Sequence, residues 1–327
     1  MIVADELPLI VQALSGEEPR EVVRLPGSGN NLVARVVFAD RTAIAKAYFH
    51  SEGDPRDRAR QEYGFLTHLE RAGVSGVPRP LAATFEQRVA LYSDHPGEVA
   101  SAESLTAADV DALVELLGAL HDAREIPGAE ALPLASEATF SPGELLTLLE
   151  ARRSRLLRGI EADPIGQRAQ AFLEGPVRDR LQRLERTLCD CLDLPLPRAE
   201  WTLSPSDLGF HNALRSDAGW VFVDFEYAGW DDPAKALADG CLTPRVPLSP
   251  GLARRFLERG LARYAQPALA ERLERLFPCW ALKWSLILLN EFSPVARQRR
   301  LYGGFEGPDP RPLQLERAAQ ALERELP

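Results

Sequence analysis

Two carboxylates and an amide in the second half of the chain have the types and spacing that phosphoryl transfer requires. Asp207 is followed five residues later by Asn212 and seventeen residues later by Asp224. A carboxylate can accept or orient the proton of an attacking hydroxyl group, and amide and carboxylate oxygens are good ligands for magnesium. We therefore assign Asp207 as the candidate catalytic residue, and Asn212 and Asp224 as the candidate metal ligands.

The same three residues have a simpler interpretation, because Asp and Asn also favour turns and strand ends. The N-terminal part of the chain decides between the two. It contains Lys46, one of only three lysines against 35 arginines, in a β-prone run. A compact ammonium group that pairs with phosphate is poorly replaced by Arg. Glu62, sixteen residues later in an expected helix, is placed to be its ion-pair partner.

Two further segments are candidates for nucleotide binding. Gly27, Ser28 and Gly29 form the tip of an expected β-hairpin, where backbone N–H groups could approach the phosphates closely because glycine has no side chain. Ser93, Asp94 and His95 follow the last β-prone run and could offer backbone hydrogen bonds to adenine. A plain turn between domains would have a similar sequence.

The stretch from Asp207 to Glu226 resembles the aminoglycoside phosphotransferase and choline kinase family. That family has H-G-D-x-x-x-x-N followed by I-D-[FW]-[EG], and this chain has S-P-S-D-L-G-F-H-N followed by V-D-F-E. The resemblance implies ATP and Mg²⁺ as cofactors and a protein-kinase-like fold. It also implies transfer of the γ-phosphoryl group to a hydroxyl of a small molecule that is aminoglycoside-, choline- or sugar-like.

The chain departs from this signature immediately before Asp207. Pro205-Ser206 stands where the family has His-Gly, and the family's His helps to hold the catalytic loop by hydrogen bonding. A nucleotide-binding pseudokinase with a regulatory role therefore remains the alternative. His211 is not at a ligand position of the family, and we expect it to pack in the loop or to face the substrate. The segment after Asp224 is short and lacks Ala-Pro-Glu, which argues against a protein substrate.

The elements that must position these residues form two lobes. Three β-prone runs over residues 21–48, a helix over 55–72 and two more β-prone runs to residue 92 predict a sheet with one helix. Helical patterns dominate afterwards, with breaks expected at Pro164 and at Gly175-Pro176. We predict an α+β, bilobal protein-kinase-like fold. Residues 1–93 would form the N-terminal nucleotide-binding lobe, 94–98 the hinge, and 99–327 the C-terminal catalytic and substrate-binding lobe.

Composition excludes several other classes of function. A net charge of −10 without a basic run gives no electrostatic basis for nucleic-acid binding. The most apolar window, residues 279–289, contains Lys283 and is too short to span a bilayer, so no membrane association is expected. Four cysteines without paired spacing favour a cytoplasmic location. The sequence does not indicate an oligomeric state. The last ninety residues contain five candidates for a wall of the acceptor pocket: Trp280, Lys283, Trp284, Asn290 and Glu291.

Overall fold

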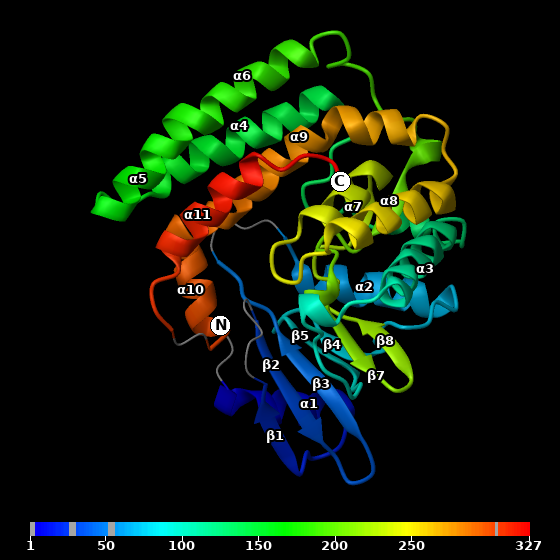
Figure 1. Cartoon of the computed structure of the whole chain (residues 1–327). Coiled ribbons are helices and arrows are strands. Elements are labelled where there is room, and N and C mark those ends of the chain that lie inside the picture. The colour runs from blue at the N-terminus through cyan, green and yellow to red at the C-terminus, as the bar shows by residue number, and fades with distance from the viewer. Residues whose placement is uncertain (1–3, 26–30, 52–55, 305–306) are drawn as a thin grey trace.

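The computed structural model describes residues 4–25, 31–51, 56–304 and 307–327. An antiparallel sheet forms the N-terminal part, and a larger, mostly helical part follows it (Figure 1). The predicted α+β architecture is therefore confirmed. β5 ends at Ser93, and the division into lobes at residues 94–98 stays our prediction.

The N-terminal sheet has five strands in the order β1-β2-β3-β5-β4. Their bounds are Glu21–Arg24 (β1), Leu32–Val37 (β2), Thr42–Ala47 (β3), Pro80–Thr84 (β4) and Val89–Ser93 (β5). In β2, buried and half-buried residues alternate, as the two-residue repeat of a strand requires. The buried residues of the sheet pack against helix α1 (Leu7–Ser15) on one face. In the strand register, Lys46 of β3 is paired with Val33 of β2 and Ala90 of β5.

Helix α2 (Arg58–Arg71) lies between the sheet and the helical part. It begins three residues later than predicted, because the Asp57 side chain caps it by accepting a hydrogen bond from the Arg60 N–H at 3.0 Å. Its inner face buries Phe65, whose ring stacks on Phe225 with centroids 5.8 Å apart. The helix that carries Glu62 is thereby fixed to the segment that carries Asp224.

The remaining helices are α3 (Ala107–Ala123), α4 (Pro142–Gly159), α5 (Pro164–Phe172), α6 (Arg178–Thr187), α7 (Pro233–Leu242), α8 (Pro250–Tyr264), α9 (Leu269–Leu288), α10 (Pro294–Tyr302) and α11 (Arg311–Leu322). Two short antiparallel pairs lie among them: β6 (Thr202–Ser204) with β9 (Gly229–Asp231), and β7 (Ala213–Ser216) with β8 (Gly219–Phe222). In the described residues no helix is long and apolar enough to cross a membrane.

The break predicted at Gly175-Pro176 is wrong. Helices α5 and α6 are joined without interruption by a π-helical turn, η4 (Leu173–Val177), with Pro176 inside it. A π-turn widens the hydrogen-bond ladder locally, which lets a helix accommodate a proline that lacks an N–H donor. The other predicted break, at Pro164, is confirmed, since this residue begins α5.

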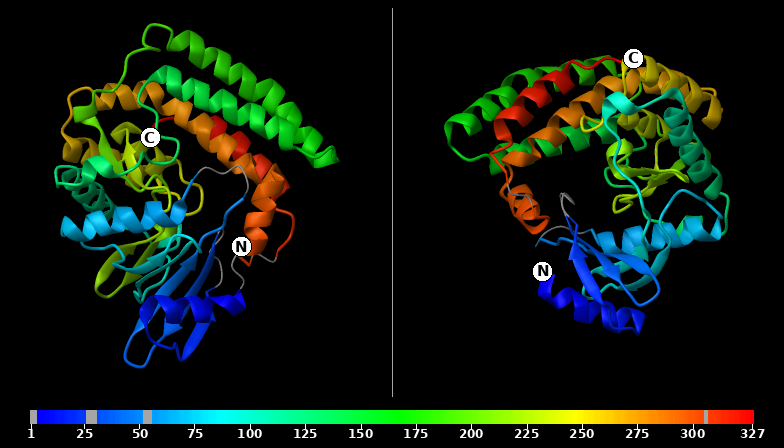
Figure 2. Two further views of the ribbon diagram at one scale, coloured as in Figure 1. Left: turned by 180° about the vertical axis from the view of Figure 1, so that it is seen from behind. Right: turned by 60° about the horizontal axis from the view of Figure 1, so that its bottom comes forward.

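The C-terminal part of the helical region contacts the N-terminal sheet. α10 lies beside the N-terminal sheet (Figure 2), where Arg24 donates a hydrogen bond to the Tyr302 carbonyl at 2.7 Å. The Tyr302 ring packs against Phe49 with centroids 5.8 Å apart.

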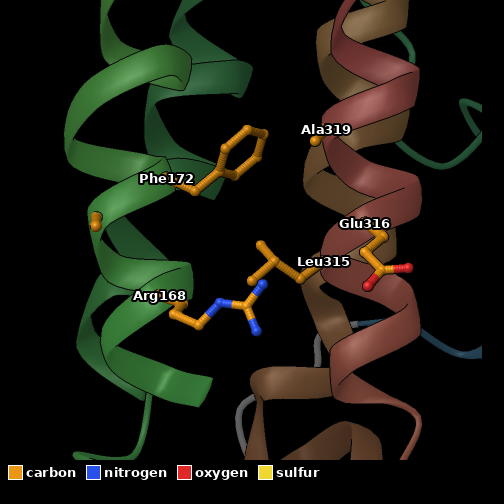
Figure 3. Close-up of a pocket in the computed structure, with 6 residues that line it drawn as sticks. Arg168, Phe172, Leu315, Glu316 and Ala319 are labelled. Atoms are coloured by element: carbon orange, nitrogen blue, oxygen red, sulfur yellow. The ribbon is translucent and has the colours of Figure 1, made fainter. Parts of the chain in front are cut away.

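An open groove lies between α5 and α11. Side chains of both helices, among them Arg168, Phe172 and Leu315, line it (Figure 3).

A buried histidine joins α3 to β6. His121 is 8% exposed, and its Nδ1 lies 3.0 Å from the Thr202 hydroxyl, which itself donates to the Leu203 carbonyl. Nδ1 must therefore carry a proton. Burial, assisted by Arg124 and Arg263, lowers the pKa of His121 from 6.5 to about 4.

This pKa makes stability depend on pH. Between pH 6.5 and about 4 the unfolded chain binds a proton at His121 that the folded chain does not, so the free energy of unfolding falls as the pH drops. We expect the loss attributable to His121 to be about 2–3 kcal/mol. Urea unfolding from pH 4 to 7 measures it. His121→Asn, which keeps a donor but cannot ionise, should flatten this part of the profile, and parallel profiles would contradict the assignment.

Candidate active site

The ammonium group of Lys46 lies among three carboxylates, one from α2 and two from the segment after β8. Its Nζ is 2.7 Å from Oε2 of Glu62 on α2, 2.6 Å from Oδ1 of Asp224 after β8, and 3.7 Å from Oε2 of Glu226. Lys46 is 7% exposed and Glu226 is fully buried. The predicted ion pair between Lys46 and Glu62 is thus formed, and it connects the sheet to the segment after β8.

Glu62 is held by two further hydrogen bonds. Oε1 accepts the backbone N–H of Phe225 at 3.0 Å, and Oε2 accepts the hydroxyl of Tyr48 at 2.7 Å. Because Tyr48 uses its proton on Glu62, the hydroxyl of Tyr92 at 2.6 Å must donate to Tyr48. Burial first, and then the charge of Glu62, raises the pKa of Tyr48, which keeps it protonated as this donor.

The charge balance of this cluster shifts two ionisation equilibria. Burial alone would lower the pKa of Lys46, but Asp224, Glu62 and Glu226 outweigh it, and the pKa is raised. Burial raises the pKa of Asp224 to about 7; Lys46 opposes this shift, while Glu226 and Glu62 add to it. A second cation near Asp224 would therefore be electrostatically favoured, because three carboxylates share one lysine.

The loop that carries Asp207 holds its carboxylate through a histidine. Nε2 of His211 lies 3.2 Å from Oδ1 of Asp207, and a carboxylate can only accept, so His211 is the donor. Burial would raise the pKa of Asp207, but His211, together with the Asn212 amide, lowers it below its ordinary value. The Asp207 side chain is ionised at neutral pH and remains 34% exposed, so it can reach a bound molecule.

Gly209 provides the space that this histidine occupies. A Cβ atom at position 209 would lie 2.6 Å from Nδ1 of His211 and 2.9 Å from its Cε1. The ring is only 7% exposed, and its Nδ1 faces the Thr243 hydroxyl at 3.4 Å. His211 was predicted to pack in the loop or face the substrate, and its contact with Asp207 was not predicted.

The β7–β8 hairpin brings the two predicted metal ligands to the same end. The pairing of Ala213 with Phe222 continues in a hydrogen bond from the Val223 N–H to the Asn212 carbonyl, 2.8 Å long. Asn212 and Asp224 therefore flank the open end of one hairpin, and the Asn212 amide donates to the Asp207 carbonyl at 3.1 Å. Asp224 adopts a left-handed backbone conformation, with φ of 67°, which turns the chain sharply after β8.

The donor atoms around Asp224 suit a hard divalent cation. Oxygen atoms of Glu62, Asp224 and Glu226 lie within 4.8 Å of one another, and carboxylate oxygens are what Mg²⁺ prefers. The sequence prediction did not include Glu226 as a candidate ligand. Its only signal was an acidic residue two positions after Asp224. In the structure Asn31 donates to Oε2 of Glu226 at 2.6 Å.

The predicted nucleotide contacts have different outcomes. Gly27, Ser28 and Gly29 lie outside the described residues. The Ser93 N–H donates to the Arg79 carbonyl at 2.9 Å, and the contact of Ser93 with adenine stays a prediction. Within the described parts of the chain, the Asp94 and His95 peptide groups make no backbone hydrogen bond. The Asp94 side chain pairs with Arg35 at 2.7 Å, beside a hollow lined also by Thr42 and Pro96.

The C-terminal candidates for an acceptor wall are mostly interior. Trp280 is 1% exposed and belongs to the main core. Lys283 and Trp284 both donate to Asp239, at 2.7 Å each to Oδ1. These three side chains therefore stabilise the helical core instead of lining a pocket. Asn290 and Glu291 are half-buried and contact Arg152 and Arg300 respectively.

The model of a family described as the phosphotransferase enzyme family matches residues 15–276 of this sequence. The chain belongs to this family. The match extends well beyond the stretch from Asp207 to Glu226, whose motifs gave the resemblance. A comparison with curated protein sequences gives no match.

Solved structures similar to this phosphotransferase share its fold at low sequence identity. Spectinomycin phosphotransferase in complex with ADP and spectinomycin has a TM-score of 0.64 at 10% identity, with 98% of each chain covered. The choline kinase LicA from Streptococcus pneumoniae has a TM-score of 0.63 at 19% identity, covering 97% of this chain and 98% of that one. An amicoumacin kinase has a TM-score of 0.65 at 15% identity, covering 98% and 93%. The predicted protein-kinase-like fold is confirmed.

The Lys46 cluster predicts a large effect on stability. Lys46→Met would leave three carboxylates without their cation, and removing one partner of a buried ion pair costs about 3–5 kcal/mol. Arg35→Met is the control in the neighbouring strand. It breaks the pair with Asp94. Because Arg35 is 43% exposed, although Asp94 is 9% exposed, the expected cost is smaller than that of Lys46→Met. Urea unfolding without nucleotide compares the two variants, and equal losses would contradict this account.

Proposed function

We propose that this protein transfers the γ-phosphoryl group of ATP to a hydroxyl group of a small molecule. The observation that carries the proposal is the convergence of Lys46 from β3, Glu62 from α2 and Asp224 from the end of β8 in one buried ion-pair cluster. These three side chains would align the phosphates and their metal beside Asp207. Phosphoryl transfer depends mainly on such positioning and on charge neutralisation.

The nucleotide would bind between the sheet and the helical part. Lys46, oriented by Glu62, would contact the phosphates, and Gly27, Ser28 and Gly29 would approach them through backbone N–H groups. The backbone groups of Asp94 and His95 are the candidates for adenine. Two of the similar structures support a nucleotide at this fold, since one contains ADP and another AMP-PNP.

Asn212 and Asp224 are the proposed magnesium ligands. Glu226 is a further candidate donor, since one of its oxygen atoms lies within 4.8 Å of oxygen atoms of Asp224 and Glu62. When bound, Mg²⁺ neutralises negative charge on the phosphates. Asp224 is suited to this role because it is 31% exposed and shares Lys46 with two other carboxylates.

Asp207 would orient the acceptor hydroxyl and receive its proton. Its lowered pKa makes it a weak base, which suffices because the attacking oxygen loses its proton late in a loose transition state. The acceptor would be an aminoglycoside-, choline- or sugar-like compound, and we propose that it is met in the cytoplasm. A pseudokinase with a regulatory role would bind nucleotide but transfer nothing, and the experiments below separate the two functions.

Substitutions of Asp207 and Asp224 should impair different steps, turnover in one case and nucleotide binding in the other. Asp207→Asn keeps the size of the side chain and should lower kcat by about 10²–10⁴-fold, the range lost with a general base, while leaving the Kd of ATP nearly unchanged. Asp224→Asn should instead weaken Mg²⁺-dependent ATP binding. Calorimetry and coupled ADP release against a panel of hydroxylated compounds measure both. Full turnover by Asp207→Asn would remove Asp207 from the proposed role.

Gly209 offers a test of how Asp207 is held. The new methyl group of Gly209→Ala overlaps the His211 ring and should displace it from Asp207, lowering kcat about tenfold or more with ATP binding unchanged. Gly251→Ala in α8 is the matched control, since its Cβ would meet no atom within 4 Å. A kcat in Gly209→Ala equal to that of this control would show that His211 does not matter for turnover.

A further inference from the structure

Ser206 adopts a backbone conformation that favours glycine. Its φ is 64°, in the left-handed region where a residue other than glycine costs of order 1–3 kcal/mol. Such strain persists only where surrounding contacts hold the residue. The backbone N–H of Ser206 donates to the Ser204 hydroxyl at 3.0 Å, at the end of β6. The side chain makes two more hydrogen bonds, and both reach distant parts of the chain.

One of these bonds comes from a buried lysine. Nζ of Lys235 on α7 lies 3.2 Å from the Ser206 hydroxyl, and Lys235 is 1% exposed. Burial would lower the pKa of Lys235, but Asp231 at 2.6 Å and Asp239 at 3.3 Å outweigh it, so the pKa is raised. Lys235 is therefore a permanent cation, and towards Ser206 it can only donate.

The other bond fixes the remaining direction of the hydroxyl group. The Ser206 Oγ donates to the carbonyl of Ser136 at 3.1 Å. Ser136 belongs to a segment that runs beside β9, held by hydrogen bonds from Trp230 N–H to the Pro133 carbonyl and from Ala135 N–H to the Trp230 carbonyl, 3.0 and 2.9 Å long. The hydroxyl thus accepts from Lys235 and donates to Ser136, and neither role can be reversed.

This arrangement also excludes a nucleophilic serine. A Ser–Lys pair activates the hydroxyl only when the lysine is neutral and can take its proton. Two carboxylates hold Lys235 protonated, and the Ser206 proton points to a carbonyl. The hydrogen bonds of Ser206 and Lys235 therefore fix the position of the loop backbone at Ser206.

Lys235 belongs to a rigid and electrically balanced cluster. Asp231, Lys235, Asp239 and Lys283, which we call the buried quartet, are all 3% exposed or less. Lys283 on α9 contacts Asp239 at 2.7 Å, and the Trp284 N–H donates to the same carboxylate. Two cations and two anions leave no net charge. The quartet joins β9, α7 and α9, and Lys235 connects it to the catalytic loop through Ser206.

We propose that Ser206 and Lys235 are positioning residues that hold the Asp207 loop in place of the family's His-Gly pair. This inference rests on the proposed function, which it deepens by explaining how turnover survives Pro205-Ser206. Ser206 contacts the β9-side segment and α7 at once, so the residue next to Asp207 is tied to two rigid elements. Neither side chain needs to touch the substrate.

Hydrogen exchange of the catalytic loop tests the anchor without reference to activity. Lys235→Met should speed amide exchange in the peptide 204–212 about tenfold or more, since local protection follows the contacts that close a segment. Arg272→Met is the matched control. It breaks a buried pair with Asp232, 2.6 Å long and one residue from Asp231, but does not contact the loop. If both variants lose equal thermal stability and equal loop protection, the anchor is refuted.

Two substitutions of Ser206 separate the anchor from backbone strain. Ser206→Ala and Ser206→Gly both remove the two side-chain bonds, but only glycine relieves the left-handed strain. With an active acceptor, both should lower kcat about tenfold to hundredfold, as a displaced catalytic group does, and leave the KM for ATP within about twofold. A Ser206→Gly enzyme with the kcat and loop protection of the wild type would overturn the proposal.

These outcomes are distinct from failure of the proposed function. If the unaltered protein phosphorylates no acceptor, the phosphotransfer proposal fails, while loop exchange in Lys235→Met still decides whether the anchor exists. If the unaltered protein is active and Lys235→Met keeps both its kcat and its loop protection, the anchor alone is wrong.

Discussion

The burial of one ammonium group constrains the arrangement of the whole N-terminal half. The Lys46 side chain is almost completely buried, and a buried charge is tolerated only when it is paired and hydrogen-bonded. Its partners come from α2 and from the segment after β8. The sheet, α2 and the β7–β8 hairpin must therefore meet at one point. Stacking of Phe65 on Phe225 and the bond from Phe225 to Glu62 reinforce the same junction.

Local patterns in the sequence predicted the elements that surround this junction. Runs of β-prone residues predicted the strands of the sheet, and helical spacing predicted α2. The pairing of Lys46 with Glu62 was predictable because a lysine is rare in this chain and a helix follows the strand at a suitable distance. Pro176 misled the prediction, since a proline usually ends a helix and only the surrounding packing selects a π-turn.

Contacts between distant loops could not be predicted. Nothing in the sequence shows that Gly209 leaves space for His211, because that requirement appears only when the loop is folded. The bond from Lys235 to Ser206 spans 29 residues and depends on β9 pairing with β6. Pro205-Ser206 consequently suggested a defect, although in the structure the Ser206 hydroxyl bonds to Ser136 and Lys235. The glycine-rich tip at residues 27–29 and the hinge keep the status of proposals.

The contact of α10 with the sheet bears on how the molecule can move. The covalent path from the sheet to the helices passes through residues 94–98. Besides the contacts around Lys46, the side chains of Arg24 and Phe49 contact Tyr302, far along the chain. Rotation about residues 94–98 must therefore break or carry along the contacts of α10, in addition to those around Lys46. Any wide separation of the two halves must first break the contacts of Tyr302 with Arg24 and Phe49. Substitutions at Tyr302, which contacts none of the proposed catalytic or metal-binding side chains in the described residues, would then alter the rate at which ligands enter and leave.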